Sequence, residues 1–416
     1  MTTILIYSLL FAFWAERVLG FTLTQVRGLS LMNLNIYLLA LVWALAVVRK
    51  RKLFEPTSVN KYLILMFFVD VNSVLVKIAL SEIQNINILD ELIAVKNWAN
   101  PFLLFFIIFN TVHDENTCKR ILLGLVVLLV VTVSTTLLIT FGGIEIGMLE
   151  VREDQRSSGF ANPVEYASYL VLFTPLLFSL LLFEKRVLVK MAVGLILIMT
   201  LCALFTTGSR GGALSFLVGV SVLIFILKRY RMISATWLAP VVIVAMMLGS
   251  YAVVPSKVKR AVMERFDPQT SGDLYEYTSG RTKIWRCGLG LFMERPFFGH
   301  GRASFSPLII ERCKIRAVAH NQYLSHLVQY GLIGLAIFVA LLVRVFQDVK
   351  NHFRTTLDPW RKKLYSCYLA GFLGYAFSML GLNVYFSRYF FWMYTAVILK
   401  YCQLEVAVPP RRVETS

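Results

Sequence analysis

The sequence predicts an all-α polytopic membrane protein with about twelve transmembrane helices. Three features predict this class: an apolar composition, repeated long apolar runs, and clusters of Lys and Arg at regular intervals. Of the 416 residues, 57% are hydrophobic and only 16% are charged, and the mean hydropathy is +0.68. A soluble domain could not bury that much apolar surface, so a membrane-embedded bundle is expected.

The apolar runs have the length of membrane-spanning helices, which need about 20 mostly apolar residues. The first run lacks the basic residues that begin a signal peptide, and other apolar runs follow it, so we expect a retained helix. The expected spans are 2–20, 31–48, 61–80, 97–112, 121–142, 165–183, 187–206, 212–227, 234–254, 321–343, 364–382 and 386–402.

The basic clusters orient the expected bundle. If the spans alternate, every cluster falls on one side of the membrane, as the positive-inside rule requires of the cytoplasmic side. Both termini are then expected in the cytoplasm. The same rule explains the net charge of +18, so this charge does not indicate nucleic-acid binding, and no nucleic-acid motif accompanies it. The clusters lie at 49–52, 119–120, 185–186, 228–231, 361–363 and 411–412.

The opposite, outer side is expected to carry one long connection, 255–320, and several short ones. Within it, SKVKRAVMERF (256–266) has Val258, Val262 and Phe266 on one helical face, which favours a helix on the outer leaflet. RTKIWRCGLGLFMER reads as a second helix that ends before a proline. The expected organisation is spans one to nine in 1–254, a periplasmic loop with surface helices in 255–320, and spans ten to twelve with a cytoplasmic tail in 321–416.

Two of the six cysteines share the long outer connection. None of the six forms a CxxC pair with metal-binding spacing. Cys287 and Cys313 both lie between 255 and 320, so a disulfide between them is possible if this segment is in an oxidising compartment.

His320 stands on the outer side, at the expected first turn of the tenth span. Gly331 and Gly334 follow it, and eleven residues bring the helix back to within about 20° of the same face. We therefore expect the two glycines to mark a face of close helix packing, with His320 at its mouth. A helix N-terminus disfavours the imidazolium, so His320 should be neutral and able to act as a general base. A locally hydrogen-bonded interfacial histidine is the alternative.

Arg210 lies in TTGSRGGA, the tightest outer connection. An arginine at a helix start opposes the helix dipole, and here it also violates the positive-inside rule. The backbone amides of Gly208, Gly211 and Gly212 are expected to be open beside it. A helix N-terminus with bare amides and a guanidinium predicts a phosphate site. The alternative is an arginine that extends its side chain to the membrane surface.

Arg281 and Arg156 repeat this pattern. Arg281 occurs in SGRTKIW, in the first turn of an expected outer helix, and Arg156 in RSSGFANP, just before the sixth span. Each alone is more simply explained as solvated. Three outer arginines near helix starts, together with His320, indicate a site for an anionic substrate.

The remaining titratable residues of the outer side offer weaker candidates. His326 is expected to pack in the core, whereas His300 in GHGRAS could lie near the site. Glu165, Glu153 and Asp154 are candidates to orient His320. The sequence has no P-loop, no HExxH, no nucleophile elbow and no DxD pair, so we expect neither a metal nor another cofactor.

Four segments in order resemble a known family. HNQYLSHLVQYGLIG resembles the O-antigen ligase signature of His, then Asn, Ser or Gln, nine residues, Gly, two residues and Gly; His320, Asn321, Gly331 and Gly334 match it. RSSGFANP, the TTGSRGG segment, and SGRTKIW followed by ERPFFGHG are similar to the other family landmarks. The resemblance covers about 150–340.

The resemblance implies a bundle like that of C-type glycosyltransferases, with one long periplasmic loop, in the bacterial inner membrane. Members of the superfamily use glycans on undecaprenyl diphosphate as donors. The ligases join the glycan to lipid A–core, and the Wzy-type polymerases join it to another lipid-linked unit, in a metal-independent, inverting reaction. By resemblance, His320 is the catalytic base, and Arg210, Arg281 and Arg156 bind the diphosphate. The supporting residues would be Asn321, Gly331, Gly334, Gly208, Gly211 and Trp285.

The sequence favours a ligase over a polymerase. The histidine signature is complete and only one outer connection is long, whereas polymerases often carry two. A transporter of lipid-linked glycans is the alternative of a different class; it would call for an inverted repeat, which is missing, and charges within the membrane. Asp70, inside the third span, is such a charge and has no explanation from the sequence.

Overall fold

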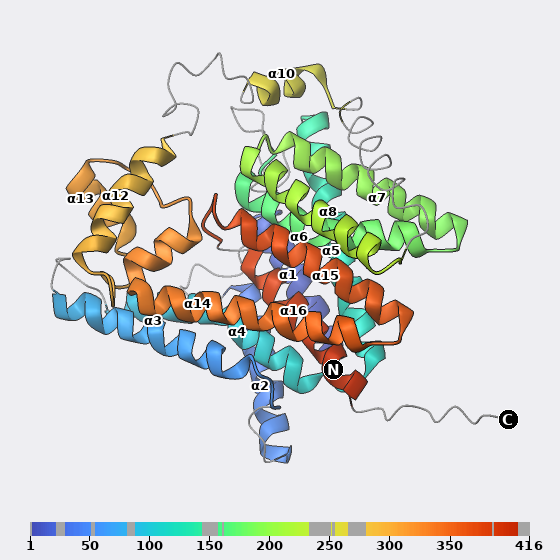
Figure 1. Ribbon diagram of the computed structural model, residues 1–416, viewed down its shortest axis with the longest axis horizontal. Coiled ribbons are helices and arrows are strands. Elements are labelled where there is room, and N and C mark those ends of the chain that lie inside the picture. Colours follow the sequence, from blue (N-terminus) through green and yellow to red (C-terminus); the bar gives the residue numbers. More distant parts are fainter. Residues whose placement is uncertain are drawn as a thin grey trace.

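The computed structural model describes residues 2–21, 30–50, 55–80, 88–143, 157–159, 162–232, 251, 254–264, 280–384 and 387–406. Throughout these residues the secondary structure is helical (Figure 1). The helices are α1 (Thr2–Arg17), α2 (Leu31–Lys50), α3 (Asn60–Leu80), α4 (Ile88–Thr111), α5 (Glu115–Gly142), α6 (Pro163–Phe183), α7 (Val187–Thr206), α8 (Arg210–Arg229), α10 (Ser256–Glu264), α12 (Arg281–Glu294), α13 (Phe305–Cys313), α14 (Gln322–Thr355), α15 (Pro359–Ser378) and α16 (Ser387–Val406).

Eight of the described helices, α2 to α8 and α14, are long and apolar enough to cross a membrane, so the protein is a multi-pass membrane protein. These eight helices coincide with eight of the twelve expected spans, and the ninth expected span, 234–254, lies mostly outside the described residues. Helix α1 has only 16 residues. Helices α15 and α16 are less apolar because they pack inside the bundle, where polar groups find protein partners. For example, the hydroxyls of Tyr368 and Thr395 lie 2.7 Å apart.

Ion pairs join several helix ends at one end of the bundle. The Lys400 ammonium near the end of α16 contacts the Glu55 carboxylate at 2.6 Å. Arg361, in the first turn of α15, lies 3.5 Å from Glu115 at the start of α5 and 3.7 Å from Glu405 at the end of α16. These helix ends are the ones that the basic clusters predict to lie together.

Hydrogen bonds join the helix ends at the opposite end of the bundle. The Ser387 amide at the start of α16 donates to the Glu165 carboxylate in the first turn of α6, at 3.0 Å. The Ser157 amide donates to the Thr206 carbonyl at the end of α7, also at 3.0 Å. The starts of α6 and α16 therefore lie at one end of the bundle, and the end of α16 at the other.

The expected ninth span, 234–254, lies mostly outside the described residues, but its flanks are placed. The ammonium of Lys362, near the start of α15, lies 5.9 Å from the centroid of the Tyr230 ring. The Tyr251 ring packs edge-on to Phe205 near the end of α7, with 5.5 Å between centroids. These flanks lie at opposite ends of the bundle, as a crossing between them requires.

Close backbone approaches define the core of the bundle, where α15 packs against α6 and α8. A Cβ on Gly371 would lie 2.3 Å from the Leu172 carbonyl oxygen of α6. An added Cβ on Gly374 of α15 would lie 3.0 Å from the Ser215 carbonyl oxygen of α8. One on Gly219, four residues later in α8, would lie 3.3 Å from the Ala370 carbonyl oxygen, four residues earlier in α15, so the two helices are antiparallel. Small residues permit this proximity between membrane helices. The start of α8 consequently lies beside the end of α15.

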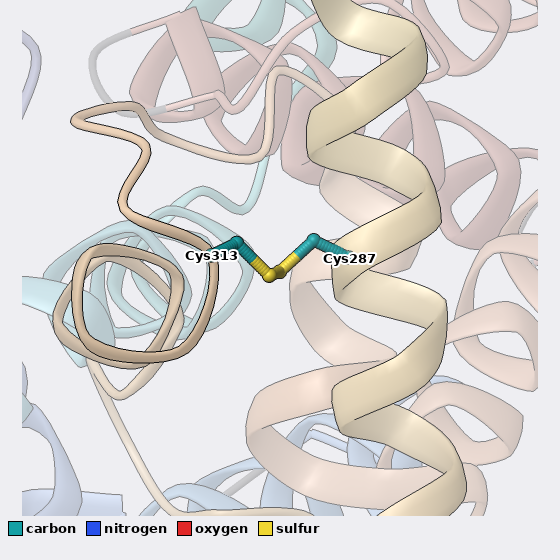
Figure 2. The surroundings of a disulfide bond; sticks show 2 residues. All are labelled: Cys287 and Cys313. Carbon is teal, nitrogen blue, oxygen red and sulfur yellow. A yellow bond between two sulfur atoms is a disulfide. The ribbon is translucent and has the colours of Figure 1, made fainter.

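The outer helices form a small unit against the first half of α14 (Figure 1). Their shared apolar cluster includes Ile284 of α12 and Leu308 of α13, packed on Leu324 of α14. The possible disulfide is present: Cys287 and Cys313 link α12 to α13, with Cα atoms 6.6 Å apart (Figure 2).

The other expected outer helix is α10. Its Val258 and Val262 are buried against Phe141 of α5 and Phe205 of α7. The apolar face of α10 therefore packs on protein rather than on lipid. Phe266, the third residue expected on this face, lies outside the described residues.

Candidate active site

His320 lies just before α14 rather than in its first turn. Asn321 is the N-cap residue, and its side-chain oxygen accepts a hydrogen bond from the Leu324 amide at 3.0 Å. The His320 backbone has φ 46°, in the left-handed region. For a residue other than glycine this conformation costs about 1–3 kcal/mol, so surrounding contacts must hold it.

Two side chains hold the backbone on either side of His320. The Trp285 indole N–H of α12 donates to the Ala319 carbonyl at 3.0 Å. The Asn321 amide donates to the Asn383 side-chain oxygen at 3.0 Å. Trp285 thus has a supporting position. Asn383 was missed in the sequence because it lies 62 residues further along the chain.

The connection between α15 and α16 supplies further contacts just after His320. The Gln322 amide donates to the Met379 carbonyl at 2.8 Å. The Gln322 side-chain oxygen accepts from the Val384 amide at 2.9 Å. The segment 379–384 therefore forms a fixed support for the start of α14.

The imidazole of His320 is suited to accept a proton. Burial lowers the pKa of His320 below its ordinary value, and the positive charge of Arg281 lowers it further. Among the described residues, the ring has no hydrogen-bond partner, so it keeps its nitrogens available for a substrate. The direction of this shift agrees with the expected neutral histidine, and burial and Arg281 are its causes.

Arg281 lies near His320 as the first residue of α12. The residue before it, Gly280, has φ 76°, a left-handed conformation that glycine adopts readily. A Cβ on Gly381 would lie 3.5 Å from the Arg281 Nη1 atom, so the guanidinium reaches the connection between α15 and α16. The fold therefore brings Arg281, Trp285 and His320 together from separate parts of the sequence.

Two of the three amides expected to be open near Arg210, those of Gly208 and Gly212, are bonded locally. The Gly212 amide donates to the Ser209 hydroxyl at 3.0 Å, which caps α8, and the Gly208 amide donates to the Phe205 carbonyl at 2.9 Å. A helix start normally satisfies its amides by such local bonds, which sequence spacing does not reveal. Gly211 faces open space, since an added Cβ would meet nothing within 4 Å.

Arg210, at the start of α8, and His320, just before α14, lie at the same end of α15. The antiparallel packing of α8 and α15 sets the start of α8 beside the end of α15. The residues that follow α15 contact both Arg281 and the start of α14. The positive charge of Arg281 acts on His320, whereas the guanidinium of Arg210 belongs to the neighbouring part of the bundle.

Arg156 lies outside the described residues, as do Glu153 and Asp154. The residue after Arg156 is placed: the Ser157 hydroxyl lies 2.7 Å from the Thr206 hydroxyl. The chain after Arg156 is therefore attached to the end of α7, close to the connection that carries Arg210.

Gly331 breaks α14 instead of lying on a continuous packing face. Its backbone has φ 68° and ψ −169°, a conformation that is essentially restricted to glycine. A Cβ at this position would lie 2.2 Å from the Phe297 carbonyl oxygen. The helical-face expectation for the two glycines is therefore wrong at Gly331, because the helix does not continue through it. Gly334 does pack against a helix, with its added Cβ 3.2 Å from Val69 of α3.

The segment 296–301, part of ERPFFGHG, fills the break in α14. The Leu332 amide donates to the Pro296 carbonyl at 2.7 Å, and the His300 amide donates to the Val328 carbonyl at 2.9 Å. These bonds satisfy backbone groups that the broken helix cannot satisfy internally. Two of the family-like segments thus form a single structural unit.

Asp70 anchors this unit to α3. Its side chain is fully buried and forms an ion pair with Arg302, and it accepts a hydrogen bond from the Tyr330 hydroxyl at 2.8 Å. Arg302 also donates to the Ala94 carbonyl of α4 at 2.6 Å. Asp70, the intramembrane charge that the sequence left unexplained, is thus paired, and its role is to hold the structure together.

His300 and His326 have buried positions with local partners. The His300 Nε2 atom lies 2.8 Å from the Leu291 carbonyl oxygen of α12, so this ring faces the outer unit. The His326 Nδ1 atom lies 3.0 Å from the Gln322 carbonyl oxygen, and its ring packs on Phe338. His326 packs in the core, as expected.

Glu165 does not orient His320. One carboxylate oxygen accepts from the Ser387 amide, and the side chain is buried at the junction of α6 and α16. The carboxylate thereby satisfies an amide at the start of α16, a common use of acidic side chains at helix N-termini.

The comparison with protein families finds a match to the model of a family described as O-antigen ligase, over residues 195–339. This segment contains His320, Arg210 and Arg281 but not Arg156. An uncharacterized protein of Haemophilus influenzae is 26% identical over 166 residues, which are 35% of this chain. The matched segment spans 40% of the length of that relative.

Proposed function

We propose that this chain is an O-antigen ligase, because residues 195–339 match the model of the family described as O-antigen ligase, whose members are glycosyltransferase-like membrane enzymes. The donor is a glycan on undecaprenyl diphosphate, and the acceptor is lipid A–core. The reaction takes place at the periplasmic face of the bacterial inner membrane, with both termini in the cytoplasm. The observation that carries the proposal is a half-buried His320 with a lowered pKa beside Arg281.

The bond changes follow from this arrangement. The acceptor hydroxyl oxygen attacks the anomeric carbon of the donor while His320 takes its proton. The bond from the anomeric carbon to the diphosphate oxygen breaks, and undecaprenyl diphosphate leaves with the electron pair. Attack from the face opposite the leaving group inverts the anomeric configuration.

The arginines stabilise the leaving group. Arg281, whose charge acts on His320, contacts the diphosphate directly, and Arg210 approaches it from the start of α8. Arg156 is the third arginine proposed to bind it. A charge-assisted hydrogen bond contributes about 1.5–3 kcal/mol, which corresponds to about 10–100-fold in rate if it forms mainly in the transition state. The diphosphate supplies the energy of transfer, so no nucleotide is needed.

The test is a reconstituted transfer reaction. Purified protein in nanodiscs receives undecaprenyl-diphosphate glycan and rough lipopolysaccharide, and products are followed by gel mobility. The variants are His320→Ala and Arg281→Gln, with Arg286→Gln as the control, because Arg286 is an exposed arginine on the same helix.

We expect lipopolysaccharide of reduced mobility from wild type and Arg286→Gln, loss of this product from His320→Ala, and about 10–100-fold less from Arg281→Gln. If the glycan lengthens on its lipid carrier while the lipopolysaccharide stays rough, the protein is a polymerase. Transfer that survives in His320→Ala would contradict the assignment of the base.

A further inference from the structure

A polar cavity of about 340 Å³ lies beside His320. Its walls come from α4, α13, the first half of α14 and the start of α16, and they include Ala319 and Gln322 on either side of His320. The volume is within the range of about 300–1,000 Å³ of small-molecule sites. A ligand in this cavity would therefore lie close to the backbone that carries the proposed base, although the His320 side chain is not itself part of the lining.

Two arginines line the cavity. Arg302 is already paired with Asp70, whereas Arg388 donates to the Asn97 carbonyl at 3.1 Å. Among the described residues, neither Arg302 nor Arg388 has a hydrogen-bond partner for its buried Nε atom, and no carboxylate lines the cavity. Buried donors without acceptors are costly, so the cavity is suited to an anion.

The rest of the lining is suited to a sugar. The side-chain amides of Gln322, Gln329 and Asn383 line it. Each oxygen already accepts from a backbone amide, so a hydroxyl group can use the second lone pair of the oxygen or the second amide hydrogen. Trp98 adds an apolar aromatic surface. A ligand with hydroxyl groups and a negative charge satisfies both parts of the lining.

We propose that this cavity binds a phosphate-bearing sugar of the acceptor, with Arg388 in contact with the phosphate. This inference rests on the proposed function. In an inverting transfer the acceptor and the leaving diphosphate lie on opposite faces of the anomeric carbon, so they need separate cationic groups. Arg281 and Arg210 serve the donor, and Arg388 and Arg302 serve the acceptor. Arg388 lies outside the matched segment 195–339, so acceptor choice depends on a part of the chain beyond it.

The test compares two acceptors: rough lipopolysaccharide with its core phosphates, and the same material after removal of phosphate with hydrofluoric acid. For Arg388→Gln we expect the KM for the phosphorylated acceptor to rise about ten-fold, with the KM for the donor unchanged. On the dephosphorylated acceptor, wild type and Arg388→Gln should have equal KM. Arg388→Lys should recover part of the difference, and Arg312→Gln, at an exposed position on α13, is the control.

Three outcomes would overturn the proposal. An equal loss on both acceptors would mean that Arg388 only supports the fold. A raised KM for the donor would assign the cavity to the donor diphosphate. Equal KM values of wild type for the two acceptors would exclude phosphate recognition.

A binding measurement separates this proposal from the proposed function. If wild type transfers glycan to neither acceptor, the proposed function fails, and thermal unfolding with glucose 6-phosphate or glucose still tests the cavity. Greater stabilisation of wild type by glucose 6-phosphate, lost in Arg388→Gln, would support a sugar-phosphate site. Equal effects of the two sugars on wild type would overturn it.

Discussion

The core of the bundle and the outer unit are held together in different ways. Helices α6, α8 and α15 meet through small residues that let backbones approach closely, as at Gly371. The outer unit of α12, α13 and the first half of α14 depends on a few specific links: the disulfide, the Asp70–Arg302 ion pair and the break at Gly331. His320 lies where the two regions meet.

This difference explains how the site is assembled. The connection after α15 belongs to the core and holds the start of α14 through Met379 and Asn383. The outer unit brings Arg281 and Trp285 to the same place. Because only a few specific links hold the outer unit, loss of one link should disturb the site more than a comparable change in the core.

The largest effect is expected from Gly331→Ala. The added Cβ would overlap the Phe297 carbonyl oxygen, and alanine disfavours this backbone conformation, so the cost should be about 3 kcal/mol or more. Thermal unfolding in detergent and glycan transfer measure the result. Gly290→Ala on α12 is the control, because an added Cβ meets nothing within 4 Å there. A fully stable, active Gly331→Ala would show that the break is dispensable.

Asp70→Ala should have a stability effect of similar size. It leaves Arg302 buried without its carboxylate, and breaking a buried pair costs about 3–5 kcal/mol. Chemical unfolding of the purified variant measures the loss. The double variant Asp70→Ala with Arg302→Met should regain part of it, because no unpaired charge remains. A double variant as unstable as Asp70→Ala would exclude the ion pair as the cause.

Removal of the disulfide with Cys287→Ser and Cys313→Ser should cost about 2–4 kcal/mol, mainly in the outer unit. Hydrogen exchange should rise in α12 and α13 and stay unchanged in α15. Cys202→Ser is the control, since Cys202 of α7 takes no part in a disulfide. Equal exchange increases in α12 and α15 would mean that the two regions unfold together.

The smallest expected effect is a shift in pH dependence. His320 must be neutral to act as a base, so transfer should fall as the pH drops through its lowered pKa, below 6.5. Removal of the positive charge in Arg281→Gln should raise the pKa of His320 and move the acid limb of kcat/KM to higher pH. An unmoved limb would mean that a different group titrates. Since His320 binds protons less readily when folded, its contribution to stability is also lost as the pH falls through this range.

Local patterns in the sequence predicted much of the protein. Apolar runs and basic clusters are local consequences of the membrane, so the helical class and most helix positions followed from them. The motif around His320 and the two placed arginines also lie in short, readable segments. The possible disulfide followed from two cysteines in one connection.

Only the tertiary structure decided which of these segments meet. The partner of Asp70 lies 232 residues away, and the backbone that fills the break at Gly331 belongs to another segment, so neither is visible in local spacing. The cavity at Arg388 likewise needs four helices to form. Sequence patterns reflect whether each segment faces lipid or water. The site depends on long-range packing between segments, which fixes where their side chains converge.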